Sequence, residues 1–96
     1  MAMRMLNRQQ RTGAGIRALR ESTGLMPRDF AALVGVNVFT LYRWELYAGK
    51  CPPPMSEASE RVFWQLEAMP VKHRCEVARA LRLQGWRAAW ALLFAS

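Results

Sequence analysis

A window of twenty residues from Pro27 to Leu46 constrains the fold of this 96-residue chain more than any other segment. Two helices that cross at a tight turn need small or apolar side chains at fixed places, because these side chains wedge the helices together. At the close approach between the helices and at the turn, the window has Ala31 and Gly35, and glycine takes a positive φ without a Cβ clash. The window therefore predicts two helices joined by a tight turn. Its five wedge positions are all apolar: Phe30, Val34, Val36, Leu41 and Trp44.

The run from Leu25 to Glu45 also resembles a known family. With its Thr-Leu-x-Arg-Trp-Glu ending and the later Gly49-Lys50, it is similar to the Xre/Cro-type (lambda repressor-like) helix-turn-helix regulators of bacteria and phages. The resemblance covers roughly residues 14 to 50. It implies a compact helical DNA-binding domain, usually dimeric, that occupies an operator to repress or activate transcription. It also implies a cytoplasmic, nucleoid-associated location.

Capping and helix-breaking residues divide the chain into short helices, and no strand pattern appears. The predicted fold class is therefore all-α, a compact bundle of five to six short helices that contains the helix-turn-helix. Thr12 and Asn37 are expected N-caps, Pro27 a first helical residue, and Gly24 and Gly35 helix ends. The expected helices are 13–23, 27–34, 38–47, one from residue 56, 71–83 and 86–95.

Three regions follow from this division. We expect a basic N-terminal arm at residues 1–11, the helix-turn-helix at 12–50, and C-terminal helices at 51–96 that complete the core and supply a dimer interface. Pro52-Pro53-Pro54 cannot lie inside a helix and marks the boundary between the last two. The side chains expected to face inward outside the window are Ile16, Ala18, Leu19, Thr23, Val62, Phe63, Leu66, Met69, Cys75, Val77, Ala78 and Leu81.

The charge of the chain favours an acidic partner. The net charge is +7, and residues 1–50 contribute eight basic and three acidic side chains against six and four in residues 51–96. The half with the helix-turn-helix is thus the more basic one, as contact with phosphate requires. Twelve of the fourteen basic residues are Arg, which suits bidentate recognition of phosphate and guanine, but a high-GC genome explains the same bias.

In this motif the second helix of the pair enters the major groove, which identifies residues for base contact. Its expected outward residues are Asn37, Val38, Phe39, Tyr42 and Arg43. Arg43 is the best candidate for specificity because a guanidinium pairs bidentately with guanine; a bridge to Glu45 or to a phosphate is the alternative. Asn37 is explained equally well by capping.

Val38 and Phe39 depart from the family, which more often has polar side chains at these positions. Exposed apolar side chains can contact thymine methyl groups, which suggests an A·T step in the half-site. The alternative is a rotated helix in which Phe39 packs inward.

A second set of residues, in the helices and in the segment that follows them, is expected to contact phosphates. These residues are Arg17, Arg28, Thr40 and Lys50. Arg4, Arg8 and Arg11 of the arm are expected either to wrap the DNA or to form a solvated tail.

The end of the chain has more apolar side chains than a short terminal helix on so small a core easily hides. Such a surplus favours an interface, and we predict a dimer surface formed by Trp86, Trp90, Leu93 and Phe94. The alternative is that these residues cap the core.

The predicted function is a sequence-specific DNA-binding regulator, a homodimeric repressor or autoregulator on an inverted-repeat operator. Two alternatives remain: the antitoxin of a toxin–antitoxin pair, with the C-terminal half on its toxin, and a protein-interaction adaptor. No enzyme, cofactor or metal site is expected, because Cys51, His73 and Cys75 lack a zinc spacing and no carboxylates cluster. No signal peptide or membrane span is expected, because apolar runs are too short.

Overall fold

The first helix begins at Thr12, whose hydroxyl accepts a hydrogen bond from the backbone N–H of Gly15 at 3.0 Å. The computed structural model describes residues 12–47 and 55–95, and no strand occurs in these two ranges, so the predicted all-α class is confirmed. The arm, Lys50, Cys51 and the three prolines lie outside the described residues. The helices are α1 (Gly13–Thr23), α2 (Pro27–Val34), α3 (Val38–Leu46), α4 (Glu57–Ala68), α5 (Val71–Gln84) and α6 (Trp86–Phe94).

Local sequence signals set the bounds of these helices. Gly24 and Gly35 end α1 and α2 with φ of 76° and 92°, the left-handed conformation that only glycine adopts without strain. The Asn37 side chain accepts a hydrogen bond from the N–H of Phe39 at 2.8 Å, and Ser56 caps α4 in the same manner through Ser59. The predicted helix bounds are therefore confirmed to within one residue.

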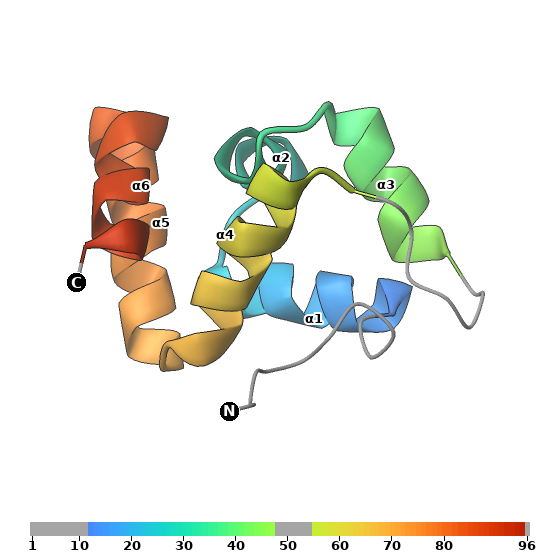
Figure 1. Ribbon diagram of the computed structural model, residues 1–96, viewed down its shortest axis with the longest axis horizontal. Helices are drawn as coiled ribbons and strands as arrows, with labels where there is room; N and C mark the ends of the chain where they lie inside the picture. The colour runs from blue at the N-terminus through green and yellow to red at the C-terminus, as the bar shows by residue number, and fades with distance from the viewer. Residues whose placement is uncertain (1–11, 48–54, 96) are drawn as a thin grey trace.

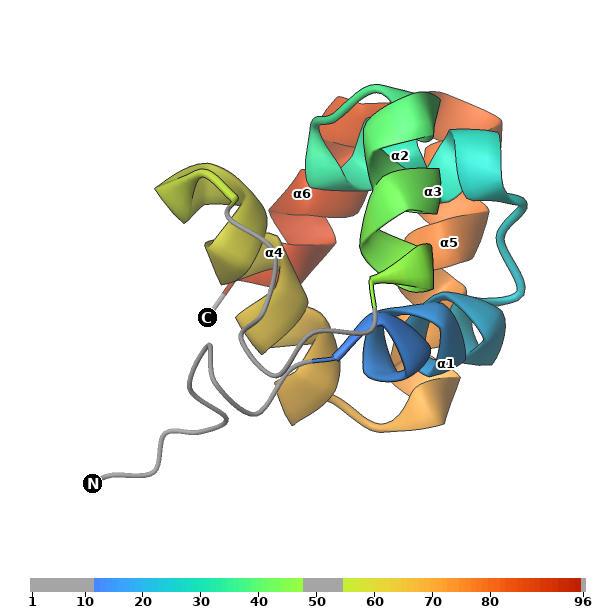
Figure 2. The same ribbon diagram turned by 90° about the vertical axis from the view of Figure 1, so that its right-hand side faces the viewer.

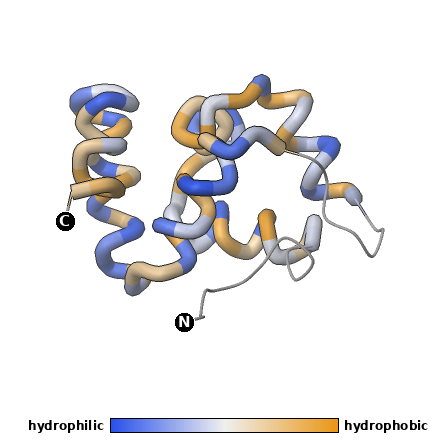
Figure 3. Tube along the Cα trace, in the orientation of Figure 1, coloured by the Kyte–Doolittle hydropathy of each residue, from blue (hydrophilic) through white to orange (hydrophobic). Residues whose placement is uncertain are grey.

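The helices are arranged around α2 and α4 in the middle of the molecule (Figure 1). Helices α5 and α6 form an antiparallel pair at one end, and α3 lies at the other end with α1 beneath it. Hydrophobic residues are distributed along all six helices rather than gathered in one of them (Figure 3). Each helix therefore contributes one face to a common core.

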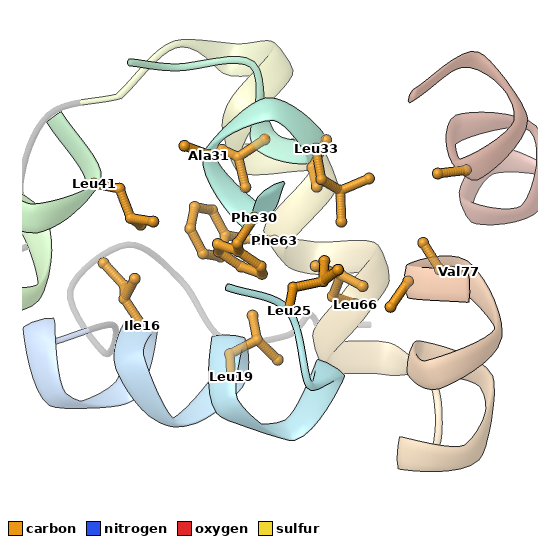
Figure 4. Packing of buried hydrophobic residues seen from close by; sticks show 14 of the residues in the cluster. Ile16, Leu19, Leu25, Phe30, Ala31, Leu33, Leu41, Phe63, Leu66 and Val77 are labelled. Atoms are coloured by element: carbon orange, nitrogen blue, oxygen red, sulfur yellow. The ribbon is translucent and has the colours of Figure 1, made fainter. Parts of the chain in front are cut away.

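Aromatic rings occupy the centre of that core (Figure 4). The rings of Phe30 and Phe63 lie 5.9 Å apart between centroids, and Trp44 lies 6.1 Å from Phe63. A single cluster of buried residues draws on all six helices, from Ile16 in α1 to Leu93 in α6. The helices after residue 55 thus share one core with α1 to α3.

Two predicted inward positions are wrong. Ala18 and Cys75 are exposed, whereas the other expected side chains are buried or partly buried against the core. The place of Cys75 is taken by Arg74, whose guanidinium donates to the carbonyl of Leu66 at 2.7 Å and to the hydroxyl of Ser22 at 3.0 Å. Partly buried hydrogen bonds of Arg74 therefore join α5 to α4 and α1 where apolar packing was expected.

The predicted dimer surface is partly wrong as well. Leu93 is 1% exposed and belongs to the core, and its carbonyl accepts a hydrogen bond from Gln65 at 2.6 Å. The Trp90 indole N–H donates to the carbonyl of Leu33 at 2.7 Å. The final helix thus closes the core of its own chain. Trp86 remains half-exposed and Phe94 is partly buried.

Gly13 lies where α1 passes close to the backbone at the end of α3. A Cβ atom at this position would lie 2.6 to 2.7 Å from the carbonyl oxygens of Trp44, Glu45 and Tyr47. We expect Gly13→Ala to push the two helices apart and lower the free energy of unfolding by about 1–3 kcal/mol, measured by urea denaturation. The matched control is Gly15→Ala, whose methyl group meets only the Thr12 hydroxyl at 3.3 Å. An equal effect of both substitutions would contradict the close approach.

Candidate nucleic-acid interface

The connection between α2 and α3 is held from behind by the C-terminal helices. The last carbonyls of α2 lack partners within their own helix. The carbonyl of Val34 accepts a hydrogen bond from the Ser59 hydroxyl of α4 at 3.1 Å, and that of Leu33 accepts the Trp90 indole of α6. Two helices from the second half of the chain thus fix the place where α2 ends and α3 begins.

An ion pair fixes the other end of α3. The guanidinium of Arg20 in α1 donates to both carboxylate oxygens of Glu45, at 2.7 and 3.1 Å. The two side chains are only 14% and 9% exposed. The hydrogen bonds to Glu45 raise the pKa of Arg20 above its usual value, although burial opposes this shift. The pair ties α3 to α1.

With its inner side held, α3 presents its outer side to solvent, away from α5 and α6 (Figure 2). Leu41 and Trp44 point into the core, so residues on the opposite side of the helix are free. The free residues are Phe39, Tyr42, Arg43 and Leu46, which share one face by their spacing. We call these four residues the α3 ridge.

The structure brings most of the predicted base-contact residues together on this surface. Phe39, Tyr42 and Arg43 are exposed, and Asn37 is exposed at the start of the helix. Phe39 is 71% exposed, so the alternative in which it packs inward is excluded. Val38 differs: it is partly buried and packs against the core, because the first turn of α3 lies over that cluster. The prediction that Val38 points outward is wrong.

Arg43 has no partner among the residues that the structure describes. The carboxylate that sequence spacing offered it, Glu45, is engaged by Arg20 instead. The guanidinium of Arg43 is therefore available for a group outside the chain.

The predicted phosphate-contact residues are more scattered. Arg28 is exposed in the first turn of α2, where no side chain caps the helix and the N–H groups favour an anion. Thr40 is partly buried, and Arg17 is exposed but pairs with Glu21 at 3.2 Å. Lys50 lies outside the described residues, as do Arg4, Arg8 and Arg11. Among the described residues, Arg28 is thus the phosphate candidate that is both exposed and without an ion-pair partner.

Most of the net positive charge of residues 1–50 belongs to residues outside the described range 12–47. Residues 12–47 contain four basic and three acidic side chains, a net charge of +1. The remaining charge of residues 1–50 belongs to the three arginines of the arm and to Lys50. Any strong attraction of this end to a polyanion therefore depends on those flanking residues.

The sequence-based prediction did not include two features of the surface. Leu46 is 82% exposed at the end of the α3 ridge, on the side of α3 that faces away from the buried Leu41 and Trp44. A groove of about 640 Å³ lies beside α4 and α6, with Trp64, Phe94 and the carboxylate-bearing Glu57 among its lining residues. The groove has no local sequence signal, since its lining comes from α4 and α6, whereas the spacing of Leu46 from Phe39 and Arg43 is itself a local signal for the outward face.

Residues 12–47 and 55–95 contain no group of three or more His, Cys, Asp or Glu side chains that could hold a metal ion. Within the same ranges, no helix has the length and apolar character needed to cross a membrane.

Comparison with known proteins adds no relative. No family model, curated protein or solved structure matches the chain.

Proposed function

We propose that the chain is a sequence-specific DNA-binding regulator in which α2 and α3 form a helix-turn-helix of the Xre/Cro type. In this proposal α3 enters the major groove and places Arg43 against a guanine edge. One observation carries it: α3 is held by its inner side, and its outer side offers an unpaired guanidinium beside exposed side chains. Such a rigid, exposed helix suits insertion into a groove about 12 Å wide.

Phosphate contacts orient the helix on the duplex in this proposal. Arg28 at the start of α2 suits one of them, because the helix dipole and free N–H groups also favour an anion there. Arg4, Arg8, Arg11 and Lys50 supply further positive charge from the flanking segments. The net charge of +7 predicts a steep fall of affinity with rising salt concentration.

A homodimer on an inverted repeat is part of the proposal, since one reading helix contacts only a few base pairs. The surface for it is revised from the sequence-based prediction. At the end of the molecule opposite α3, the exposed apolar residues are Leu83, Trp86 and Leu92, with exposures of 68%, 48% and 48%. These three residues replace Trp90 and Leu93, which pack within their own chain, as the apolar surface for a second chain.

Substitution of Arg43 tests the reading role directly. We expect Arg43→Ala to weaken binding to the preferred site by about 1–3 kcal/mol, roughly 5- to 150-fold, because a bidentate contact is lost. Binding to random duplex is expected to change by much less, since only one positive charge is removed. Fluorescence anisotropy with both duplexes measures the difference.

The matched variant Arg43→Lys keeps the charge and loses the planar fork, so we expect it to resemble Arg43→Ala on the preferred site and the wild type on random duplex. If Arg43→Ala weakens both duplexes by the same factor, base contact by Arg43 is excluded.

A second candidate function is binding of a protein partner, as an antitoxin or an adaptor. The exposed Leu83, Trp86 and Leu92 support it equally, because they suit a foreign chain as well as a second copy. An adaptor predicts no steep dependence of duplex binding on salt concentration. An antitoxin predicts DNA binding together with a stable complex between its C-terminal half and a second protein.

A further inference from the structure

The α3 ridge is mostly apolar, which is unusual for a helix that reads bases. Phe39, Tyr42 and Leu46 are 71%, 44% and 82% exposed, and the first two rings meet edge to face with centroids 6.4 Å apart. None of these three side chains contributes to the buried core. A cluster of exposed apolar side chains on one helix face commonly marks a binding surface.

Hydrogen-bonding capacity on the same surface is small. The ridge offers the Arg43 guanidinium and the Tyr42 hydroxyl. Beside it, Asn37 uses its side-chain oxygen to cap α3, where it accepts the N–H of Phe39 at 2.8 Å. Two or three polar groups cannot distinguish several base pairs by hydrogen bonding alone. Any further discrimination on this face must come from apolar contact.

The charge beside the ridge limits what can cover it. Arg43 is unpaired among the described residues and Arg28 is exposed on the preceding helix. The ligand that fits is therefore apolar at its centre and negatively charged at its edges. The major groove has this character wherever pyrimidines carry a C5-methyl group, because that methyl is the apolar group on the base edges and phosphates border the groove.

We propose that the aromatic pair Phe39–Tyr42, extended by Leu46, recognises pyrimidine C5-methyl groups in the major groove. Thymine and 5-methylcytosine both carry this group, so binding depends on thymine positions and responds to cytosine methylation. This inference rests on the function proposed for α3. It adds a second specificity determinant to Arg43 and assigns a role to Leu46, which the sequence-based prediction did not include.

The test uses the full chain and a duplex site obtained by selection from random DNA. Each thymine of the site is replaced in turn by deoxyuridine, which removes the methyl group alone. We expect about a 4-fold loss of affinity for each contacted methyl, which corresponds to the ~0.8 kcal/mol of one buried methyl-sized group. In Phe39→Ala the same replacement is expected to have no effect at the positions that Phe39 contacts. Phe39→Leu retains an apolar side chain and is expected to keep most of the dependence.

A second arm distinguishes the two sources of the methyl group. At each sensitive position the T·A pair is replaced by C·G or by 5-methylcytosine·G. A gain of about 4-fold from the cytosine methyl, lost in Phe39→Ala, supports recognition of the methyl in either base. A dependence on deoxyuridine without a gain from 5-methylcytosine restricts the proposal to thymine and overturns the response to methylation.

Failure of this inference differs from failure of the proposed function. Methyl recognition is overturned if selection yields a preferred site but replacing thymine by deoxyuridine leaves the affinity of the wild type unchanged. It is also overturned if that replacement lowers the affinity of Phe39→Ala as much as that of the wild type. The ridge then belongs to a protein partner or to another contact. If selection yields no preferred site, the DNA-reading function fails and this inference fails with it.

Discussion

Replacement of Arg20 by Ala is expected to lower the free energy of unfolding by about 3–5 kcal/mol, among the largest effects of a single substitution in this chain. The substitution leaves the carboxylate of Glu45, whose side chain is 9% exposed, without the guanidinium that neutralises it. An uncompensated charge with little access to water is costly. Urea denaturation followed by the fluorescence of the tryptophans measures the loss.

The chain supplies a matched control on the same helix. Arg17 pairs with Glu21 at 3.2 Å, but these side chains are 64% and 58% exposed. We expect Arg17→Ala to change the free energy of unfolding by no more than about 0.5 kcal/mol, as exposed i,i+4 pairs do. A loss in Arg20→Ala no larger than in Arg17→Ala would show that the Arg20–Glu45 pair is not structural.

The double variant Arg20→Leu, Glu45→Leu removes both charges. We expect it to be more stable than Arg20→Ala, because the main cost is the charge left without a partner rather than the loss of the pair. The difference in stability between the double variant and Arg20→Ala therefore measures the cost of the unpartnered carboxylate separately from the loss of the ion pair.

Replacement of Phe63 by Ala is expected to cost about 3–5 kcal/mol of unfolding free energy, a large share of the total for a domain of this size. Phe63 is completely buried and contacts the rings of both Phe30 and Trp44. Its removal leaves a cavity where α2, α3 and α4 meet. Circular dichroism against urea concentration measures the midpoint and the slope.

The neighbouring residue is the control for that substitution. Trp64 follows Phe63 on α4 but is 39% exposed, since successive residues of a helix point about 100° apart. We expect Trp64→Ala to cost about 1 kcal/mol or less, although it deletes the larger side chain. Similar losses in both variants would mean that the core is not centred on Phe63.

Helix bounds were predictable because the signals that set them are local. Thr12, Asn37 and Ser56 each accept a backbone N–H of the helix that follows, and these bonds join residues two or three apart in the chain. Gly24 and Gly35 end helices by adopting a φ that other residues avoid. Such features need no knowledge of the tertiary structure.

Long-range partners were not predictable in the same way. Glu45 bonds Arg20 across 25 residues rather than its neighbour Arg43, and Arg74 reaches Ser22 across 52. The apolar surplus of the last helix favoured a dimer surface, but Leu93 is buried in the core and the Trp90 indole donates to the α2 carbonyl of Leu33 within the same chain. A sequence pattern identifies which side chains need partners, whereas the packing of the helices decides which partners they find.

The candidate site was predictable to an intermediate degree. The spacing of the α2–α3 window placed Phe39, Tyr42 and Arg43 on one outward face, as the structure has them. It wrongly placed Val38 on this outward face. Val38 is partly buried and packs against the core. The prediction did not include Leu46, although its spacing from Phe39 and Arg43 puts it on the same outward face, where it is 82% exposed.

DNA reading by α3 can be measured by selecting bound sequences from a random duplex library. We expect an enriched inverted repeat with half-sites centred about 10 base pairs, or one helical turn, apart. We further expect a guanine in each half-site whose enrichment disappears when Arg43→Ala is used for the selection. The absence of any enriched sequence at low salt, or an enrichment unchanged by Arg43→Ala and Phe39→Ala, would contradict DNA reading by α3.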